Sequence, residues 1–142
     1  LVCSDVARQA EIDRLSSRTE DFEIDNFVLK DATVSSIPQQ LMLDKSISSL
    51  IILKSLFGQI PGYVSDLDTV GIEKVSFSNG LNWSHFQNLD NVKSVRLRQV
   101  NIPSLNEDFQ KCMSKNLVIL ELTETKTSFI ADNAFAGFNW RI

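Results

Sequence analysis

The sequence predicts an α/β repeat solenoid, in which coils of 20-odd residues stack so that about five strands form one curved parallel sheet. Three observations predict it. The stretch VSSIP at 34–38 returns as FGQIP at 57–61, each with a large apolar residue three positions before Ile-Pro. Apolar residues recur at fixed places along the chain. Finally, 142 residues of which 43% are hydrophobic and 23% charged are typical of one globular domain that buries a core.

The repeating frame has apolar residues at its first, fourth, sixth, eleventh and fourteenth places. Its copies start at Ile24, Ile47, Ile72, Val92 and Leu117. Three copies are complete, whereas the third fails at its last two places and the fifth at one. In the third copy Leu81, Trp83 and Phe86 lie close enough to substitute. The frame predicts that the fourth places align in one interior row: Phe27, Leu50, Val75, Val95 and Leu120.

The frame also predicts how each coil runs. Side chains of a strand alternate between its two faces, so the fourth and sixth places face the interior together. The eleventh and fourteenth places return inward from the segment that leaves the strand. One such coil has no partner layer and must stack on another. Loops and short helices on the convex side would be anchored by Leu41, Leu67, Leu89, Phe109, Met113, Phe135 and Phe138. The alternative, a domain of ordinary βαβ units, needs roughly 30 residues or more per unit.

Residues 22–142 resemble the leucine-rich repeat family. ILKSLFGQIP, VRLRQVNIPSL and LVILELTETKTSFIADNAFAGF are similar to repeats of the extracellular type, in which an Ala-Phe-x-Gly-apolar tail is familiar. One departure concerns the ninth place, where the family usually has Asn or Cys. This chain has Ala32, Ser55, Gly80, Val100 and Thr125 there. The resemblance therefore implies that the asparagine ladder of the family is absent or replaced by Ser and Thr.

The two ends of the chain do not follow the frame. Residues 1–21 are predicted to cap the first coil, as an amphipathic helix after Ser4 with its apolar face at Val6, Ala10, Ile12 and Leu15. After residue 138 no capping segment is visible. We expect either that the chain is truncated there, as a fragment of a longer protein, which we favour, or that a partner covers the open end.

Cysteine and histidine are scarce, with Cys3, Cys112 and His85 as the whole set. Three such residues cannot form a zinc cluster, and no glycine-rich loop for a phosphate is present, so we expect neither a metal ion nor a cofactor. Cys3 and Cys112 lie about four coils apart, on the order of 20 Å by the strand spacing, which a disulfide cannot span. A partner for Cys3 upstream of this chain stays open. We expect Cys112 to be a buried thiol and His85 to lie on a solvated loop.

The charge of the chain narrows the class of partner. A net charge of −4 and a pI near 4.9 argue against nucleic acid or an anionic membrane. No apolar run reaches the roughly 18 residues of a membrane-spanning helix. We therefore expect a protein partner, and we leave the oligomeric state open.

The expected binding surface is the concave strand face, where repeat proteins present side chains to partners. Its predicted site residues are Val28, Ile51 and Leu53 as an apolar half, and Lys74, Lys93, Arg96 and Arg98 as a basic half bordered by Glu73 and Glu121. Contiguous exposed apolar side chains often mark an interface. The alternatives are that Leu53 packs against its neighbours, and that the basic half is tied up in cross-strand pairs such as Arg96 with Glu121.

Two classes of function follow. The resemblance implies a non-catalytic recognition or scaffold module, because the family mostly serves such roles. The alternative is a regulatory, non-catalytic subunit of a secreted enzyme complex, since the chain is also loosely similar to secreted arthropod leucine-rich repeat proteins. The other class is an enzyme, for example a hydrolase that uses Cys112 with His85, or carboxylates such as Glu121 and Glu124. No pocket-like sequence surrounds either pair, so we expect no enzyme.

Asn82-Trp83-Ser84 is an acceptor pattern for N-glycosylation. The modification requires an exposed loop in a secreted chain, and this triplet follows the third predicted strand, where a loop is expected. Together with the extracellular character of the last repeat, it predicts a secreted glycoprotein or an ectodomain.

Overall fold

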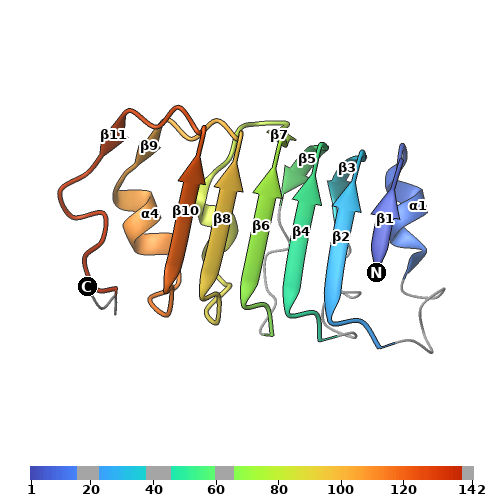
Figure 1. The fold of residues 1–142 in the computed structure, drawn as a ribbon, viewed down its shortest axis with the longest axis horizontal. Coiled ribbons are helices and arrows are strands. Elements are labelled where there is room, and N and C mark those ends of the chain that lie inside the picture. Colours follow the sequence, from blue (N-terminus) through green and yellow to red (C-terminus); the bar gives the residue numbers. More distant parts are fainter. Residues whose placement is uncertain (16–22, 38–45, 60–65, 139–142) are drawn as a thin grey trace.

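The chain folds around a parallel sheet whose strands follow one another in sequence order. The structure, a computed structural model, describes residues 1–15, 23–37, 46–59 and 66–138. Its six-stranded sheet has the order β1-β2-β4-β6-β8-β10, and every neighbouring pair is parallel (Figure 1). The strands are β1 (Val2–Ser4), β2 (Asn26–Lys30), β4 (Ser49–Leu53), β6 (Thr69–Glu73), β8 (Ser94–Arg98) and β10 (Ile119–Thr123). The α/β class and the parallel sheet are therefore confirmed.

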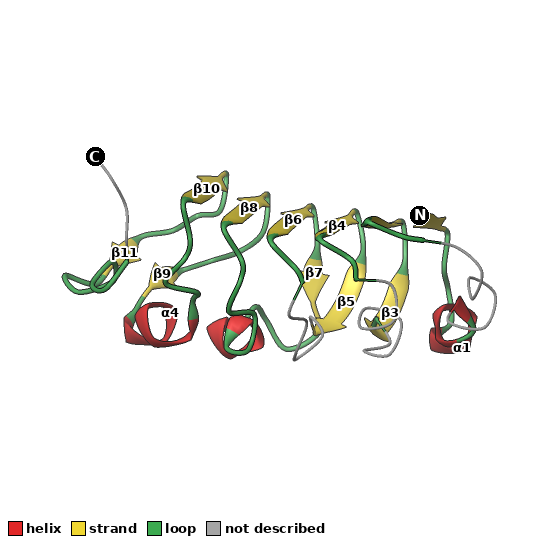
Figure 2. Ribbon diagram, turned by 90° about the horizontal axis from the view of Figure 1, so that it is seen from below, coloured by secondary structure: helices red, strands yellow, loops and turns green. Residues whose placement is uncertain are grey.

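A second layer lies behind this sheet. It contains the three-stranded parallel sheet β3-β5-β7 and the pair β9-β11. Its elements are β3 (Thr33–Ser36), β5 (Leu56–Gln59), β7 (Ser76–Phe77), β9 (Ser104–Leu105), β11 (Phe129–Ile130), the helices α1 (Gln9–Asp13) and α4 (Glu107–Cys112), and the 3-10 helix η1 (Trp83–Phe86). Figure 2 shows that all of them lie on the same side of the six-stranded sheet. Its other side, here called the open face, is covered by none of these elements.

The strands align their interior side chains in register. Phe27 is paired with Leu50, Leu50 with Val70, Val70 with Val95, and Val95 with Leu120. The first four are fully buried. The neighbouring row consists of Leu29, Ile52, Ile72, Leu97 and Leu122. The two rows thus pack in register from strand to strand on the side of the sheet that faces the second layer.

The predicted position of the third coil was wrong by five residues. The frame started it at Ile72 and put Val75 in the interior row, but β6 begins at Thr69, and Leu67 and Val70 occupy the first and fourth places. Frames that start at Leu67 and at Ile72 both place apolar residues at most of their positions, so the apolar pattern alone could not decide between the two starts. Pairing decides, because only residues 69–73 hydrogen-bond in register with both β4 and β8.

The ninth place of each repeat is buried, although the frame made no prediction for it. With the corrected start, the third coil has Val75 there in place of Gly80. The Ser55 hydroxyl donates to the Leu53 carbonyl at 2.8 Å and accepts from the Ala32 N–H at 3.1 Å. Ser55 therefore links the segment after β4 to the segment after β2, at the place where the family usually has an asparagine and where a Ser or Thr replacement was expected.

A left-handed residue follows every strand of the large sheet. These residues are Asp5, Asp31, Lys54, Lys74, Gln99 and Glu124, with φ between 47° and 57°. The N–H of Lys54 donates to the Glu73 carbonyl at 2.9 Å, and the N–H of Lys74 donates to the Arg98 carbonyl at 3.0 Å. The left-handed conformation turns the chain out of the strand while the turn residue stays hydrogen-bonded to the neighbouring strand.

The first residues add a sixth strand to the five that were predicted. β1 pairs with β2, and the amino group of Leu1 donates to the Asn26 carbonyl at 2.8 Å. The helix α1 starts at Gln9 instead of directly after Ser4, and it buries Ile12. The segment therefore covers the first coil with a strand and a helix, and not with a helix alone.

The side chains predicted to anchor the convex side lie in the layer behind the six-stranded sheet, and most of the described ones are buried. Leu67, Leu89, Phe109 and Met113 are buried, whereas Leu41 lies outside the described residues. Phe109 is the centre of an aromatic cluster, with ring centroids 4.9 Å from Trp83, 6.0 Å from Phe135 and 5.7 Å from Phe138. The predicted anchors Phe135 and Phe138 are exposed and half-buried respectively.

The last coil is less well covered than the others. Leu120 and Leu122 are half-buried, although their counterparts in the preceding coils are buried. Phe129 and Ile130 in β11 are 58% and 53% exposed. Among the described residues, β10 is an edge strand of the large sheet, so Leu120 and Leu122 are covered on one flank only.

Candidate protein-binding face

The open face presents the alternate residues of the six strands that do not point into the core. Its central row, in register across the sheet, is Val2, Val28, Ile51, Gly71, Arg96 and Glu121. A second row is Ser4, Lys30, Leu53, Glu73, Arg98 and Thr123. Along the central row the side chains change from apolar on the first strands to charged on the last ones, whereas the second row is polar or charged except for Leu53.

The apolar half lies where the sequence predicts it. Val28, Ile51 and Leu53 are on the open face, in the neighbouring strands β2 and β4, and all three are half-buried. Gly71 follows Ile51 in the row and contributes no side chain, so the flank of Ile51 is not covered by a neighbour there. Leu53 is only half-buried, so the alternative in which it packs fully against its neighbours holds only in part.

The charged half is paired across strands. The guanidinium of Arg96 lies 3.5 Å from the Glu121 carboxylate, which confirms the expected cross-strand pair. Arg98 lies 3.9 Å from Glu73. All four side chains are more than a third exposed, so solvent screens both pairs and each contributes little to stability.

Two predicted basic residues lie at the margins of this face. Lys93 directly precedes β8 and is exposed. Lys74 is not on the strand, as the shifted frame had placed it, but in the left-handed turn after β6. The strand residue that faces outward there is Glu73. The structure therefore groups Arg96, Arg98 and Lys93, while Lys74 projects from the carboxyl edge of the sheet.

Sequence reasoning missed two apolar contributions to the open face. Val2 in β1 is 65% exposed and Ile119 in β10 is 42% exposed, one on each edge strand. Val2 was assigned to a helical cap, so it could not be placed on the sheet. Ile119 occupies an outward place of the frame, and its large apolar side chain was the signal available from the sequence.

The candidate nucleophile and base lie on neighbouring helices without a bond between them. Cys112 ends α4, and burial, followed by the charge of Asp108, raises the pKa of its thiol. His85 lies in η1, half-buried and not on a solvated loop, and burial lowers its pKa. Its Nδ1 atom is buried, and within the described part of the chain it has no hydrogen-bond partner. A raised thiol pKa disfavours the thiolate that a nucleophile requires.

The two cysteines are free, as their separation predicts. Cys3 in β1 points into the core beside Leu29, and burial raises the pKa of its thiol. Among the residues that the structure describes, no three Cys, His, Asp or Glu side chains are grouped as metal ligands.

The acceptor Asn82 is exposed at the start of η1. Its side-chain oxygen accepts a hydrogen bond from the Ser84 N–H at 3.0 Å and caps the 3-10 helix. The following Trp83 is buried against Phe86 and Phe109. The triplet is thus held on the surface by a buried tryptophan.

Comparison with known proteins identified no relative: no protein-family model, no curated protein and no solved structure matches the chain. Across the described ranges, no helix combines the length and the apolar character required to cross a membrane.

Proposed function

We propose that the chain is a non-catalytic recognition or scaffold module of the leucine-rich repeat type, which binds a protein partner through its open face. The observation that carries the proposal is the central row of that face, where Val28 and Ile51 lie beside Arg96 and Glu121 with only Gly71 between them. A surface with an apolar core next to polar, charged groups is the usual composition of a protein interface.

The solenoid part of the proposal has its own support. The strands of the large sheet follow one another in sequence order, and their interior rows are in register. Backbone hydrogen bonds also join neighbouring repeats in the segments just before and just after each strand. On the entry side the N–H of Lys93 donates to the Asp68 carbonyl at 2.8 Å, and the N–H of Val118 donates to the Lys93 carbonyl at 2.7 Å. This nearest-neighbour organisation is the defining property of repeat proteins.

The charged half suits a partner that presents both signs of charge. The pairs of Arg96 with Glu121 and of Arg98 with Glu73 are solvent-exposed, so they can be exchanged for partner side chains at small cost. Such charges act mainly on the rate of association and on specificity, while the apolar half contributes the buried area.

The binding proposal is tested by placing charge in the apolar half. The double variant Ile51→Asp, Leu53→Asp should lose a partner that the wild-type chain retains in a pull-down from an extract of the source organism, with an unchanged circular dichroism spectrum. Thr33→Asp, Ser35→Asp is the matched control, because these exposed residues lie in β3, behind the sheet. Equal retention by the wild type and both double variants would reject the open face as the binding surface.

The same proposal includes an extracellular location, supported by the exposed Asn82 in an acceptor triplet. Expression through a secretory pathway should give a product whose mass falls after treatment with peptide N-glycosidase. Asn82→Gln should remove that mass difference. A secreted wild-type chain without a glycan at Asn82 would contradict this part of the proposal and leave the binding test unaffected.

A further inference from the structure

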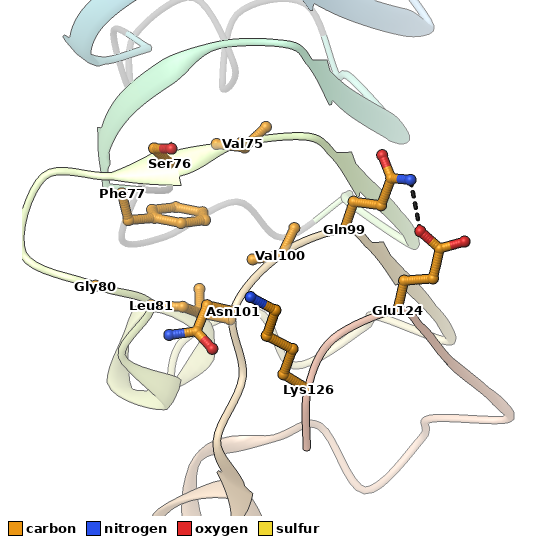
Figure 3. A pocket seen from close by; sticks show the side chains of 10 residues that line it. All are labelled: Val75, Ser76, Phe77, Gly80, Leu81, Gln99, Val100, Asn101, Glu124 and Lys126. Atoms are coloured by element: carbon orange, nitrogen blue, oxygen red, sulfur yellow. Dashed lines mark hydrogen bonds between the residues drawn. The ribbon is translucent and has the colours of Figure 1, made fainter.

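The second layer contains a hollow where its strand pairing changes. The sheet β3-β5-β7 ends at β7, and the next strand of this layer, β9, pairs with β11 and not with β7. After β8, residues 99–101 lead to β9 without pairing with β7. The segment 75–81 and the segment 99–101 therefore separate. A hollow of about 610 Å³ opens between them. It is lined by Val75, Ser76, Phe77, Gly80, Leu81 and by Gln99, Val100, Asn101, Glu124 and Lys126 (Figure 3).

One side of the hollow is apolar. Val75 and Val100 are buried beneath it, and Phe77 and Leu81 are half-buried along it. The ring of Phe77 is held edge-on by Phe57, with centroids 6.2 Å apart at 79°. A volume of several hundred Å³ with apolar walls is in the range that accepts a small organic molecule. An aromatic or other planar apolar body would find Phe77 as its stacking partner.

The polar side of the hollow has two charged residues, Glu124 and Lys126, and they lie apart from each other. The Gln99 side-chain amide donates to the Glu124 carboxylate at 2.6 Å. Figure 3 shows this pair at one margin, while the Lys126 amino group extends toward Val100 and the apolar wall. Among the described residues, the ion pairs that form do not include Lys126. The ammonium nearest the apolar wall therefore remains able to bind an anion.

We propose that this hollow binds a small amphipathic molecule with a planar apolar body against Phe77 and Leu81 and one anionic group at Lys126. A neutral analogue of the same shape keeps the apolar contact but loses the charge–charge attraction to the Lys126 ammonium. A cationic analogue meets Lys126 with like charge. The site does not depend on the open face, so it goes beyond the proposed recognition function.

The proposal is tested with three indole probes that share one body and differ in charge. Indole-3-acetate, indole-3-acetamide and tryptamine are titrated into the full chain and followed by amide chemical shifts in ¹H–¹⁵N NMR spectra. We expect the dissociation constants to rise in that order, with the shifts concentrated at 75–81 and 99–101. No saturable binding, or shifts confined to other segments, would overturn the proposal.

Two substitutions test separately the contribution of the Lys126 charge and that of the space in the hollow to binding. Lys126→Gln should weaken indole-3-acetate about three- to tenfold, because the ion pair is lost, and should weaken the amide probe less. Lys54→Gln is the matched control, because this exposed lysine is also left-handed but lies outside the hollow. Asn101→Trp adds bulk from an exposed position and should prevent binding of all three probes. Unchanged affinity for the anion in Lys126→Gln would refute the assigned role of Lys126, whether or not the tryptophan variant folds.

Discussion

Gly58 in β5 lies so close to Ser35 in β3 that a β-carbon on the glycine would overlap the Ser35 carbonyl oxygen and stand 2.9 Å from its carbonyl carbon. Gly71 in β6 is different, because a β-carbon there would make ordinary contacts, 3.6 Å from Cγ1 of Ile51. Both residues lie in strands. Backbone approach therefore requires a glycine at only one of the two positions.

This contrast predicts opposite effects of the same substitution. Gly58→Ala should lower the free energy of unfolding by about 1–3 kcal/mol, because the strands β3 and β5 must separate. Gly71→Ala should raise it by about 0.5–1 kcal/mol, since glycine in a strand loses more backbone entropy on folding than alanine. Urea denaturation of both variants beside the wild type measures the difference. Equal effects would contradict the close approach of β5 to β3.

Ser55 predicts a second stability effect. Ser55→Ala removes the partner of the buried Ala32 N–H and should cost about 1–3 kcal/mol of unfolding free energy. Ser76→Ala is the control, because Ser76 is exposed and should change stability by less than about 0.5 kcal/mol. If thermal denaturation gave the two variants the same midpoint, the hydrogen bond between Ser55 and Ala32 would not stabilise the fold.

The interior of the fold was largely predictable from the sequence, because burial imposes spacing. Phe27, Leu50, Val95 and Leu120 align in register as the frame predicts. The third strand was misplaced because the segment from Leu67 onward is apolar at too many positions for a spacing rule to choose one frame. Which of two frames is used depends on hydrogen bonding to both neighbouring strands, which acts between distant segments.

The surfaces were less predictable than the interior. The apolar half of the open face follows directly from strand alternation, so Val28, Ile51 and Leu53 were placed correctly. The hollow beside Phe77 could not be foreseen, since it arises where β9 pairs with β11 and leaves β7 as an edge strand. No periodicity of apolar residues marks such a change of partner.

The left-handed turns predict that the free energy of unfolding depends on the shape of the side chain at the turn residue. Lys54 has φ of 47°, a region that β-branched residues avoid because of their second Cγ or Oγ atom. Lys54→Val should therefore destabilise the chain by roughly 1 kcal/mol, the strain that β-branching adds to the left-handed cost that Lys54 already bears. Lys93→Val, at an exposed residue outside the positive-φ set, should have a smaller effect in the same denaturation experiment. A smaller loss in Lys54→Val than in Lys93→Val would contradict strain in the turn.

His85 predicts how stability depends on pH near neutrality. Burial lowers its pKa in the folded chain below its ordinary value of about 6.5. Below that value the unfolded chain binds a proton that the folded chain does not, so the free energy of unfolding should fall as pH decreases from about 7 toward 5. His85 is the sole histidine of the sequence, so His85→Gln should flatten this part of the profile. A wild-type profile that rises with acidification would show that the folded chain favours the protonated ring.

The ion pair of Arg96 with Glu121 predicts a small coupling energy. Both side chains are more than half exposed, at 59% and 55%, so water and salt screen their attraction. A double-mutant cycle of Arg96→Ala and Glu121→Ala should give a coupling of about 0.2–1 kcal/mol at low salt and less at high salt. Lys111 and Glu107, an exposed pair within α4 at 3.7 Å, provide a matched cycle away from the open face. A coupling well above that range would mean that the charged half is locked internally, and a partner could then engage it only by breaking the pair.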